Sequence, residues 1–367
     1  MPSTIKRVLI IAPQWIGDAV MTEPLVNDWV QEGREITVAA LPHIAPVYRA
    51  MQGVAQVLEW SFKRKKIELL KRYQVASELK GHFDVCVICP NSFKAALIPW
   101  LAGVPTRIGY LGEFRRWFLT QELANPARDH RGSMVAFYRA LGPKNLSKQH
   151  VVLAQQSLEV ENTSKLALRD TPNLSINAEL TQKVLLQHAL TRGSFTVIAP
   201  GAEYGYAKRW PTEYFAALVS KISSGGTPVL ILGSEADRAL ATQIKDSAEA
   251  LLKTNTDNSS HRELIKNLAG QTTLTEAMAL IASAKSLISN DSGLMHIGAA
   301  FATPQVAIFG SSSPLHTPPL STKAKVLWLS LECSPCFKRT CPLGHLKCLR
   351  EISVESVVAA EQSALNM

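Results

Sequence analysis

Short apolar runs alternate with amphipathic stretches along most of the chain. In the first half, residues 7–13 (RVLIIAP) form a continuous apolar run, which is typical of a strand buried on both faces. The same pattern predicts further strands at residues 35–41, 55–60, 83–90 and 106–110, and helices at 19–32, 67–81 and 133–142. Alternation of this kind is typical of parallel sheets in α/β domains.

The second half of the chain repeats the pattern. Apolar runs predict strands at residues 195–201, 228–234, 263–270, 286–291, 304–310 and 325–330, and helices are predicted at 211–222, 236–253, 274–284 and 292–301. The pattern weakens from Val151 to Asn177, where polar residues surround Pro172, and we expect the linker between two domains there. We therefore predict two Rossmann-like domains with parallel sheets that face one another across a cleft, with ligands beyond the carboxyl ends of the strands.

Composition and charge narrow the class of protein. The chain has 367 residues, of which 46% are hydrophobic and 19% charged, so it is globular rather than disordered or collagen-like. Its formal net charge of +9 is uneven, because residues 1–175 hold 22 Lys and Arg against 15 Asp and Glu, and residues 176–367 hold 17 against 15. The first half is expected to meet an acidic partner: nucleic acid, an anionic membrane surface or a phosphorylated substrate.

The sequence also bears on the compartment. No apolar run reaches the ~18–20 residues that cross a bilayer. The apolar run near the first residue is too short for a secretory signal and lacks a small-residue cleavage site. We expect a cytoplasmic protein, with at most peripheral contact with a membrane.

Six cysteines fall into two groups. Cys86 and Cys89 lie in a predicted strand and are expected to be core residues of a reduced protein. The other four are spaced as C-x2-C-x4-C-x6-C, at Cys333, Cys336, Cys341 and Cys348. This spacing leaves a structural metal clip, a redox pair and reduced structural thiols open.

The segment Asn290–His296 has the character of a phosphate site. It follows an apolar strand and opens an apolar helix that Asp291 or Ser292 is placed to cap. Gly293 allows the backbone to come close to a ligand, and the free N–H groups of the first helical turn favour phosphate. His296 lies one turn into the helix, where its ring either points back at the ligand or is buried in the core.

Four other features carry candidate chemistry. Lys208, in the segment Pro200–Pro211 after a predicted strand, is placed to neutralise a diphosphate or is simply solvated, and the segment lacks a P-loop pattern. Asp18, at the mouth of the first strand, is a candidate general base or a helix N-cap, and no GxGxxG precedes it, which disfavours a nicotinamide dehydrogenase. Glu235 either binds a ribose or begins a helix. A basic run, solvated or bound to an anionic partner, is formed by Lys63, Arg64, Lys65 and Lys66, with Arg115 and Arg116 further on.

Taken together, these motifs resemble the lipopolysaccharide heptosyltransferases of glycosyltransferase family 9. The similarity covers nearly the whole chain and rests on IAPQWIGDAVMTEPL, PGAEYGYAKRWP, LILGSEAD, LAGQTTLTE, NDSGLMHIGAAFATPQVAIFGSSSP and CSPCFKRTCPLGHLKCL. PGAEYG and the cysteine-bearing tail favour the type II branch of the family. The resemblance implies a GT-B fold, with an acceptor-binding domain at residues 1–172, an ADP-sugar-binding domain at 173–350, and a C-terminal helix at 351–367 that packs back on the first domain.

The resemblance also implies the reaction. Such enzymes transfer L-glycero-D-manno-heptose from ADP-heptose with inversion and without a metal or other cofactor. For the type II branch the acceptor is the first heptose of heptosyl-Kdo2-lipid A, a phosphorylated glycolipid at the anionic inner membrane, and nucleic acid is not a partner.

Carried over by position, Asp18 is the catalytic base and Lys208 holds the departing diphosphate. The donor is expected to meet Ala202, Glu203, Lys208, Glu235, Asp291, Ser292, Gly293 and His296. The acceptor is expected to meet Lys63, Arg64, Lys65, Lys66, Arg115 and Arg116.

Other activities stay open at this point. A heptosyltransferase of type I or III would act on another core acceptor. A nucleotide-sugar 2-epimerase of the same architecture would need no acceptor and would leave the basic run unexplained. A non-catalytic protein that binds a nucleotide or an anionic glycolipid would release no ADP.

Overall fold

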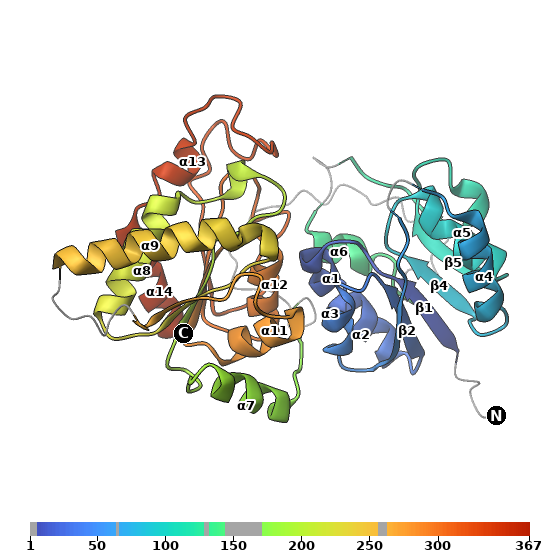
Figure 1. Cartoon of the computed structure of the whole chain (residues 1–367). Coiled ribbons are helices and arrows are strands. Elements are labelled where there is room, and N and C mark those ends of the chain that lie inside the picture. The colour runs from blue at the N-terminus through green and yellow to red at the C-terminus, as the bar shows by residue number, and fades with distance from the viewer. Residues whose placement is uncertain (1–5, 64–65, 128–131, 144–170, 256–262) are drawn as a thin grey trace. The chain divides into compact units, whose positions relative to one another are not determined.

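The computed structural model describes residues 6–63, 66–127, 132–143, 171–255 and 263–367. The chain divides into two compact units, Met1–Asn173 and Leu174–Met367, which Figure 1 shows in blue to teal and in green to red. Each unit is described by itself. Among the described helices, none combines the length and the apolar character that crossing a membrane requires.

Unit 1 is built on a parallel six-stranded sheet in the order β3-β2-β1-β4-β5-β6. The strands are β1 Arg7–Ile11, β2 Glu35–Ala40, β3 Val54–Glu59, β4 Val85–Ile88, β5 Thr106–Tyr110 and β6 Gln121–Leu123. The inner strands β1, β2 and β4 are almost wholly buried, as their apolar runs predict for strands covered on both faces.

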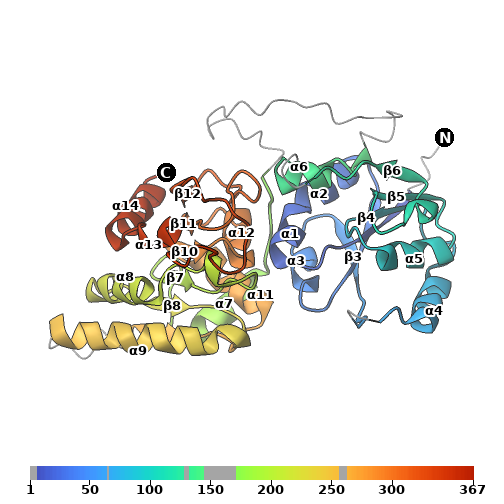
Figure 2. The ribbon, with the colours of Figure 1, turned by 90° about the horizontal axis from the view of Figure 1, so that it is seen from above.

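The helices of unit 1 form two groups of neighbours. One group is α1 Ile16–Met21, α2 Glu23–Gln31, α3 Ala45–Arg49 and α6 Met134–Arg139, which contact one another. The other is α4 Leu69–Leu79, α5 Phe93–Leu101 and the 3₁₀ helix η1 Arg116–Phe118, where α5 contacts both α4 and η1. Figure 2 shows α4 and α5 near one another in this unit.

The single helix predicted at residues 19–32 is two helices in the structure. Pro24 has no N–H to donate and would clash with the preceding turn, so α1 ends and α2 begins around it. Between them, Thr22 Oγ1 donates to the Ala19 carbonyl (2.6 Å) and lies 2.9 Å from the Tyr48 hydroxyl.

Unit 2 is a second parallel six-stranded sheet, in the order β12-β11-β10-β7-β8-β9. The strands are β7 Thr196–Ala199, β8 Val229–Ile231, β9 Ile265–Asn267, β10 Ser286–Asn290, β11 Gln305–Ile308 and β12 Ala324–Leu327. The helices are α7 Ala178–Gln187, η6 Tyr206–Lys208, α8 Thr212–Ser224, η7 Glu235–Asp237, α9 Arg238–Asn255, α11 Leu274–Ser283, α12 Gly293–Ala300, α13 Lys347–Arg350 and α14 Val354–Leu365.

The C-terminal helix α14 belongs to unit 2, so the prediction that it packs back on the first domain is wrong. It packs against β10, β11, β12 and α8, and Val357 and Ala360 join the core of that unit (Figure 2). The buried carboxylate of Glu361 accepts hydrogen bonds from Ser286 Oγ (2.5 Å) and Thr196 Oγ1 (3.3 Å). These bonds tie α14 to the two central strands of the sheet.

Each sheet has one point at which the strand order reverses. It lies between β1 and β4 in unit 1 and between β7 and β10 in unit 2. Ligands of open parallel sheets bind beyond the carboxyl ends of the strands at such a point. The segments after β1, β7 and β10 are therefore where a site is expected in each unit, and they carry Asp18, Lys208 and Asp291.

Candidate functional site

Asp18 follows β1 and lies in the first turn of α1, where Trp15 holds the N-cap position. Its half-buried carboxylate accepts a hydrogen bond from the Tyr138 hydroxyl of α6, over 3.0 Å. Burial, and then the charge of Asp18, raise the pKa of Tyr138 well above its ordinary value, so the hydroxyl stays protonated and remains a donor. Asp18 is thus a positioned carboxylate rather than a helix cap.

The predicted acceptor residues divide into three cases. Lys63 and Lys66 are exposed, and Arg64 and Lys65 lie outside the described residues. Arg116 is also exposed and pairs with Glu122 over 3.2 Å.

The prediction that Arg115 faces an acceptor is wrong. Its side chain is fully buried, and its guanidinium donates to the Tyr110 carbonyl (2.7 Å from Nε) and to the Pro90 carbonyl. Burial lowers the pKa of Arg115 to about 10. A guanidinium whose donors are held by backbone oxygens serves the fold and has no surface to offer a ligand.

In unit 2, Asn290 fastens the segment Pro200–Pro211 to the end of β10. Its Nδ2 donates to the Pro200 carbonyl (2.7 Å), and its Oδ1 accepts from the Trp210 N–H (3.0 Å). The segment is thereby held at both ends on a fully buried side chain. Lys208 lies within it and is positioned by this clamp.

Lys208 forms an ion pair with Asp291, the first residue after β10. The Asp291 carboxylate is buried, and its Oδ1 also accepts from Thr317 Oγ1 (3.4 Å). The Lys208 ammonium lies 5.3 Å from the centre of the Tyr204 ring. Two of the predicted donor residues are therefore brought together, although 83 residues separate them in the chain.

Ser292 is the N-cap residue of α12, yet its hydroxyl caps no N–H. Within the described part of the chain its Oγ is buried and has no hydrogen-bond partner, and the same holds for Ser311 and Ser312 in the loop after β11. Buried hydroxyls are normally hydrogen-bonded, and the free N–H groups of the first turn of a helix favour an anion. Gly293 opens the helix beside them.

His296 is almost wholly buried in α12. Desolvation lowers its pKa to about 4, partly offset by the charge of Asp291, so the imidazole is neutral at pH 7. A neutral ring supplies no positive charge to a phosphate. That charge has to come from Lys208 and the N–H groups of α12.

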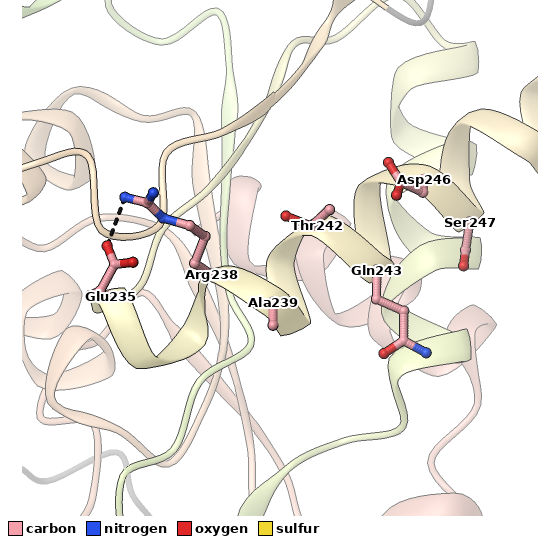
Figure 3. Close-up of a pocket in the computed structure, with 7 residues that line it drawn as sticks. All are labelled: Glu235, Arg238, Ala239, Thr242, Gln243, Asp246 and Ser247. Carbon is pink, nitrogen blue, oxygen red and sulfur yellow. Dashed lines mark ion pairs between the residues drawn. The ribbon is translucent and has the colours of Figure 1, made fainter.

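The remaining donor candidates lie after β7 and β8. Ala202 is buried and Glu203 is exposed. Glu235 opens η7, pairs with Arg238 over 2.7 Å, and lines an open pocket of about 670 Å³ along α9, as Figure 3 shows. A carboxylate at this open edge is accessible to a ligand.

All four tail cysteines line one small cavity in unit 2, together with His345, and all six cysteines of the chain are free thiols. Cys86 and Cys89 are buried in the first unit, Cys86 within its core. In the described part of the chain, no group of three or more His, Cys, Asp or Glu residues is arranged to hold a metal ion.

The chain is similar to known proteins over most of its length. The model of the family "Glycosyltransferase family 9 (heptosyltransferase)" matches residues 72–347. Lipooligosaccharide heptosyltransferase 2 of Haemophilus ducreyi is 33% identical over 335 residues, and lipopolysaccharide heptosyltransferase 2 of Escherichia coli K12 is 31% identical over 328; each match covers 88% of both proteins.

The solved structure of the E. coli ADP-heptose lipopolysaccharide heptosyltransferase II superposes with a TM-score of 0.79 at 29% identity, covering 98% of each chain. Together with the two parallel six-stranded sheets, this match confirms the predicted GT-B fold class.

Proposed function

The chain belongs to glycosyltransferase family 9, and from that premise we propose that it transfers L-glycero-D-manno-heptose from ADP-heptose to the first heptose of heptosyl-Kdo2-lipid A. The names of its relatives support heptose transfer in the lipopolysaccharide inner core. The choice of this acceptor rests on the relatives named heptosyltransferase 2, which match over most of the chain.

One observation carries the proposal: the Lys208 ammonium is held by Asp291, the residue directly before the N-cap of α12. Lys208 lies on one side, paired with Asp291, and the unpartnered Ser292, Ser311 and Ser312 hydroxyls belong to the segments after β10 and β11. A diphosphate would satisfy those hydroxyls and meet the positive end of the helix. ADP is a leaving group of that chemistry.

In the proposed reaction Asp18 removes the proton from the acceptor hydroxyl. The hydroxyl oxygen attacks the anomeric carbon of the heptose from the face opposite the diphosphate. The bond between that carbon and the diphosphate oxygen breaks, ADP leaves with the electron pair, and the configuration inverts. Tyr138 orients the Asp18 carboxylate through the 3.0 Å hydrogen bond.

The departing diphosphate needs positive charge, which we assign to Lys208 and to the first N–H groups of α12 rather than to a metal ion. Fixed donors of this kind stabilise charge that develops as the bond breaks. The ribose of the donor is assigned to Glu235, at the open pocket beside η7 (Figure 3).

On the acceptor side, we assign the phosphorylated core to the exposed basic residues Lys63, Lys66 and Arg116, with Arg64 and Lys65 in the same run. The acceptor is a lipid, so we propose that the enzyme works in the cytoplasm in peripheral contact with the anionic inner membrane.

The decisive experiment measures ADP release from ADP-heptose with Kdo2-lipid A acceptors that carry no heptose, one or two. We expect release only with the one-heptose acceptor, whose mass increases by one heptose. Release with the heptose-free acceptor would assign a type I activity, and release with the two-heptose acceptor a type III activity. Formation of an epimerised donor without any acceptor would contradict the proposed transfer and assign an epimerase activity.

A further inference from the structure

In unit 1, the helices α4 and α5, the 3₁₀ helix η1 and the turn just before η1 expose large apolar side chains. We call five of them the aromatic face: Leu70 (89% exposed), Tyr73 (62%), Trp100 (45%), Phe114 (97%) and Trp117 (86%). Single exposed apolar residues are ordinary, but a contiguous set marks an interaction surface. The proposed reaction uses none of these five residues.

The elements that carry the aromatic face pack on one another. Helix α5 contacts α4 on one side and η1 on the other. At the second contact the Trp100 ring meets the Phe118 ring edge-on, with centroids 5.1 Å apart. Figure 2 shows α4 and α5 in the same part of unit 1. The five side chains therefore come from segments that are neighbours in unit 1.

The structure holds the tip of this face out in solvent. Glu113 and Phe114 both have positive φ, at 43° and 57°, a conformation that is uncommon for side chains of this kind. The Glu113 carboxylate accepts the N–H of Phe93, the first residue of α5, over 3.0 Å and so fastens the turn to the helix. The backbone turn that carries the almost fully exposed Phe114 side chain is thus tied to α5.

Positive charge surrounds the same side chains. Residues 61–120 contain eleven Lys and Arg against four Asp and Glu, whereas residues 1–60 contain four against six. The segment that bears the aromatic face therefore accounts for the positive charge of the first half of the chain. Lys66 and Lys71 are exposed, and so is Arg116, between Phe114 and Trp117.

We propose that the aromatic face docks on an anionic lipid bilayer, with Phe114, Trp117 and Leu70 entering the headgroup region and the cations meeting lipid phosphates. Aromatic rings prefer the interface of a membrane, and basic residues beside them add attraction to anionic lipid. A second copy of the chain fits poorly, because both partners would bring the same positive charge to the contact. Nucleic acid is a less suitable partner, because the aliphatic side chain of Leu70 cannot stack on a base.

This inference deepens the proposed function, because an enzyme whose acceptor is a lipid has to work at a bilayer. Its test needs neither donor nor acceptor, so the two can fail separately. The full chain is mixed with vesicles of phosphatidylcholine alone, or of phosphatidylcholine with about one quarter phosphatidylglycerol, and the bound fraction is measured by flotation. We expect binding to the anionic vesicles that weakens as salt is raised, and little binding to the neutral ones.

Two variant pairs test the parts of the surface. Phe114→Ser with Trp117→Ser should lower the partition coefficient about tenfold or more, and the matched control Leu186→Ser with Leu315→Ser, which removes exposed apolar residues of unit 2, should not. Lys66→Gln, Lys71→Gln and Arg116→Gln should each lower it about fivefold. The matched controls Lys183→Gln, Lys221→Gln and Lys253→Gln remove exposed lysines of unit 2 and should leave the partition coefficient unchanged.

A second measurement locates the ring. Brominated phosphatidylcholine in the anionic vesicles should quench tryptophan fluorescence, and Trp117→Phe should lose part of that quenching while still binding. Equal binding to neutral vesicles, equal losses in the unit 2 controls, or a concentration-dependent dimer that Trp117→Ser abolishes would each overturn the proposal. Phe114 and Trp117 are both exposed, so their substitution should leave thermal unfolding unaltered. This measurement checks that the variants are folded.

Discussion

A single carboxylate in unit 1 and a single ammonium in unit 2 carry the proposed chemistry. Asp18 is held by the Tyr138 hydroxyl, and Lys208 lies in a loop that Asn290 clamps at both ends. Both depend on long-range partners. Each of these residues, and each partner that holds it, can therefore be tested by its own substitution.

Asp18→Asn keeps the size of the side chain and removes the base. We expect ADP-heptose binding to be retained and transfer to fall by about 10²–10⁴-fold, the usual contribution of a positioned base. Binding is followed by calorimetry and transfer by ADP release. Near-normal turnover would remove Asp18 from the role of base.

Tyr138→Phe deletes the hydroxyl that donates to Asp18. The carboxylate loses a hydrogen bond that stabilises its charged form, so it takes up a proton at higher pH than in the native enzyme. We expect the acid limb of the pH profile of kcat/KM to move to higher pH, with the affinity for ADP unchanged. An unshifted profile would mean that Tyr138 only packs.

Lys208→Ala removes the proposed diphosphate cation. We expect ADP affinity to fall about ten- to a hundredfold, as for loss of a charged hydrogen bond, and Lys221→Ala, at an exposed site on α8, to change nothing. The variant also leaves Asp291 buried without its cation.

The double variant Lys208→Ala, Asp291→Asn separates the two effects of that change. If the loss of affinity comes from the unpaired carboxylate, the double variant recovers it. If it comes from the missing cation, the double variant stays weak. Unchanged ADP affinity in the single variant would contradict the assignment.

At the scale of elements, α12 and β10 form the proposed donor site and pack closely. A Cβ at Gly298 would lie 2.4 Å from Leu287 Cδ2, within β10. Gly298→Ala should therefore cost about 1–3 kcal/mol by overpacking and lower the melting temperature of the protein. Gly132→Ala, where an added methyl group meets open space, is the control for differential scanning calorimetry. If Gly298→Ala and Gly132→Ala melt at the same temperature, Leu287 of β10 moves to make room for the added methyl group.

The elements themselves follow from the sequence to a large extent. Parallel strands that are buried on both faces favour apolar residues at most positions, so β1, β4 and β7 are visible as largely apolar runs. The site segments are found because they follow those runs. The prediction of one helix at residues 19–32 is wrong, because the chain divides into two helices around Pro24. Proline lacks the N–H that a continuous helix needs there, but the regular apolar spacing on both sides of it suggested a single helix.

What the sequence misses depends on partners far along the chain. Tyr138 lies 120 residues from Asp18, and nothing local marks it as a donor. Arg115 reads as surface charge beside Arg116, yet carbonyl oxygens surround it. The apolar stripe of α14 predicts a buried face but cannot say which sheet it covers. Nothing in the sequence next to Asn290 marks its hydrogen bond to the Pro200 carbonyl, 90 residues away in the chain.

For the whole molecule, the positive charge of the first half is assigned both to the phosphorylated acceptor and to the anionic bilayer that carries it. Lys63→Gln with Lys66→Gln should raise the KM for the phosphorylated acceptor and leave donor affinity unchanged, because both lysines are exposed in unit 1. The matched control is Lys183→Gln with Lys253→Gln in unit 2. Steady-state kinetics with a micellar acceptor measures the effect, and an unaltered acceptor KM would return the run to a role in solubility.

The membership of α14 in unit 2 has a consequence for how the protein is made. Residues 354–365 leave the ribosome after every strand of the second sheet, so the surface that Val357 and Ala360 cover stays bare until those residues emerge. The first unit ends at Asn173 and can fold while the rest is translated. The nascent chain therefore carries a finished first half beside a sheet that stays open to chaperones, or to premature association, until its final helix is released.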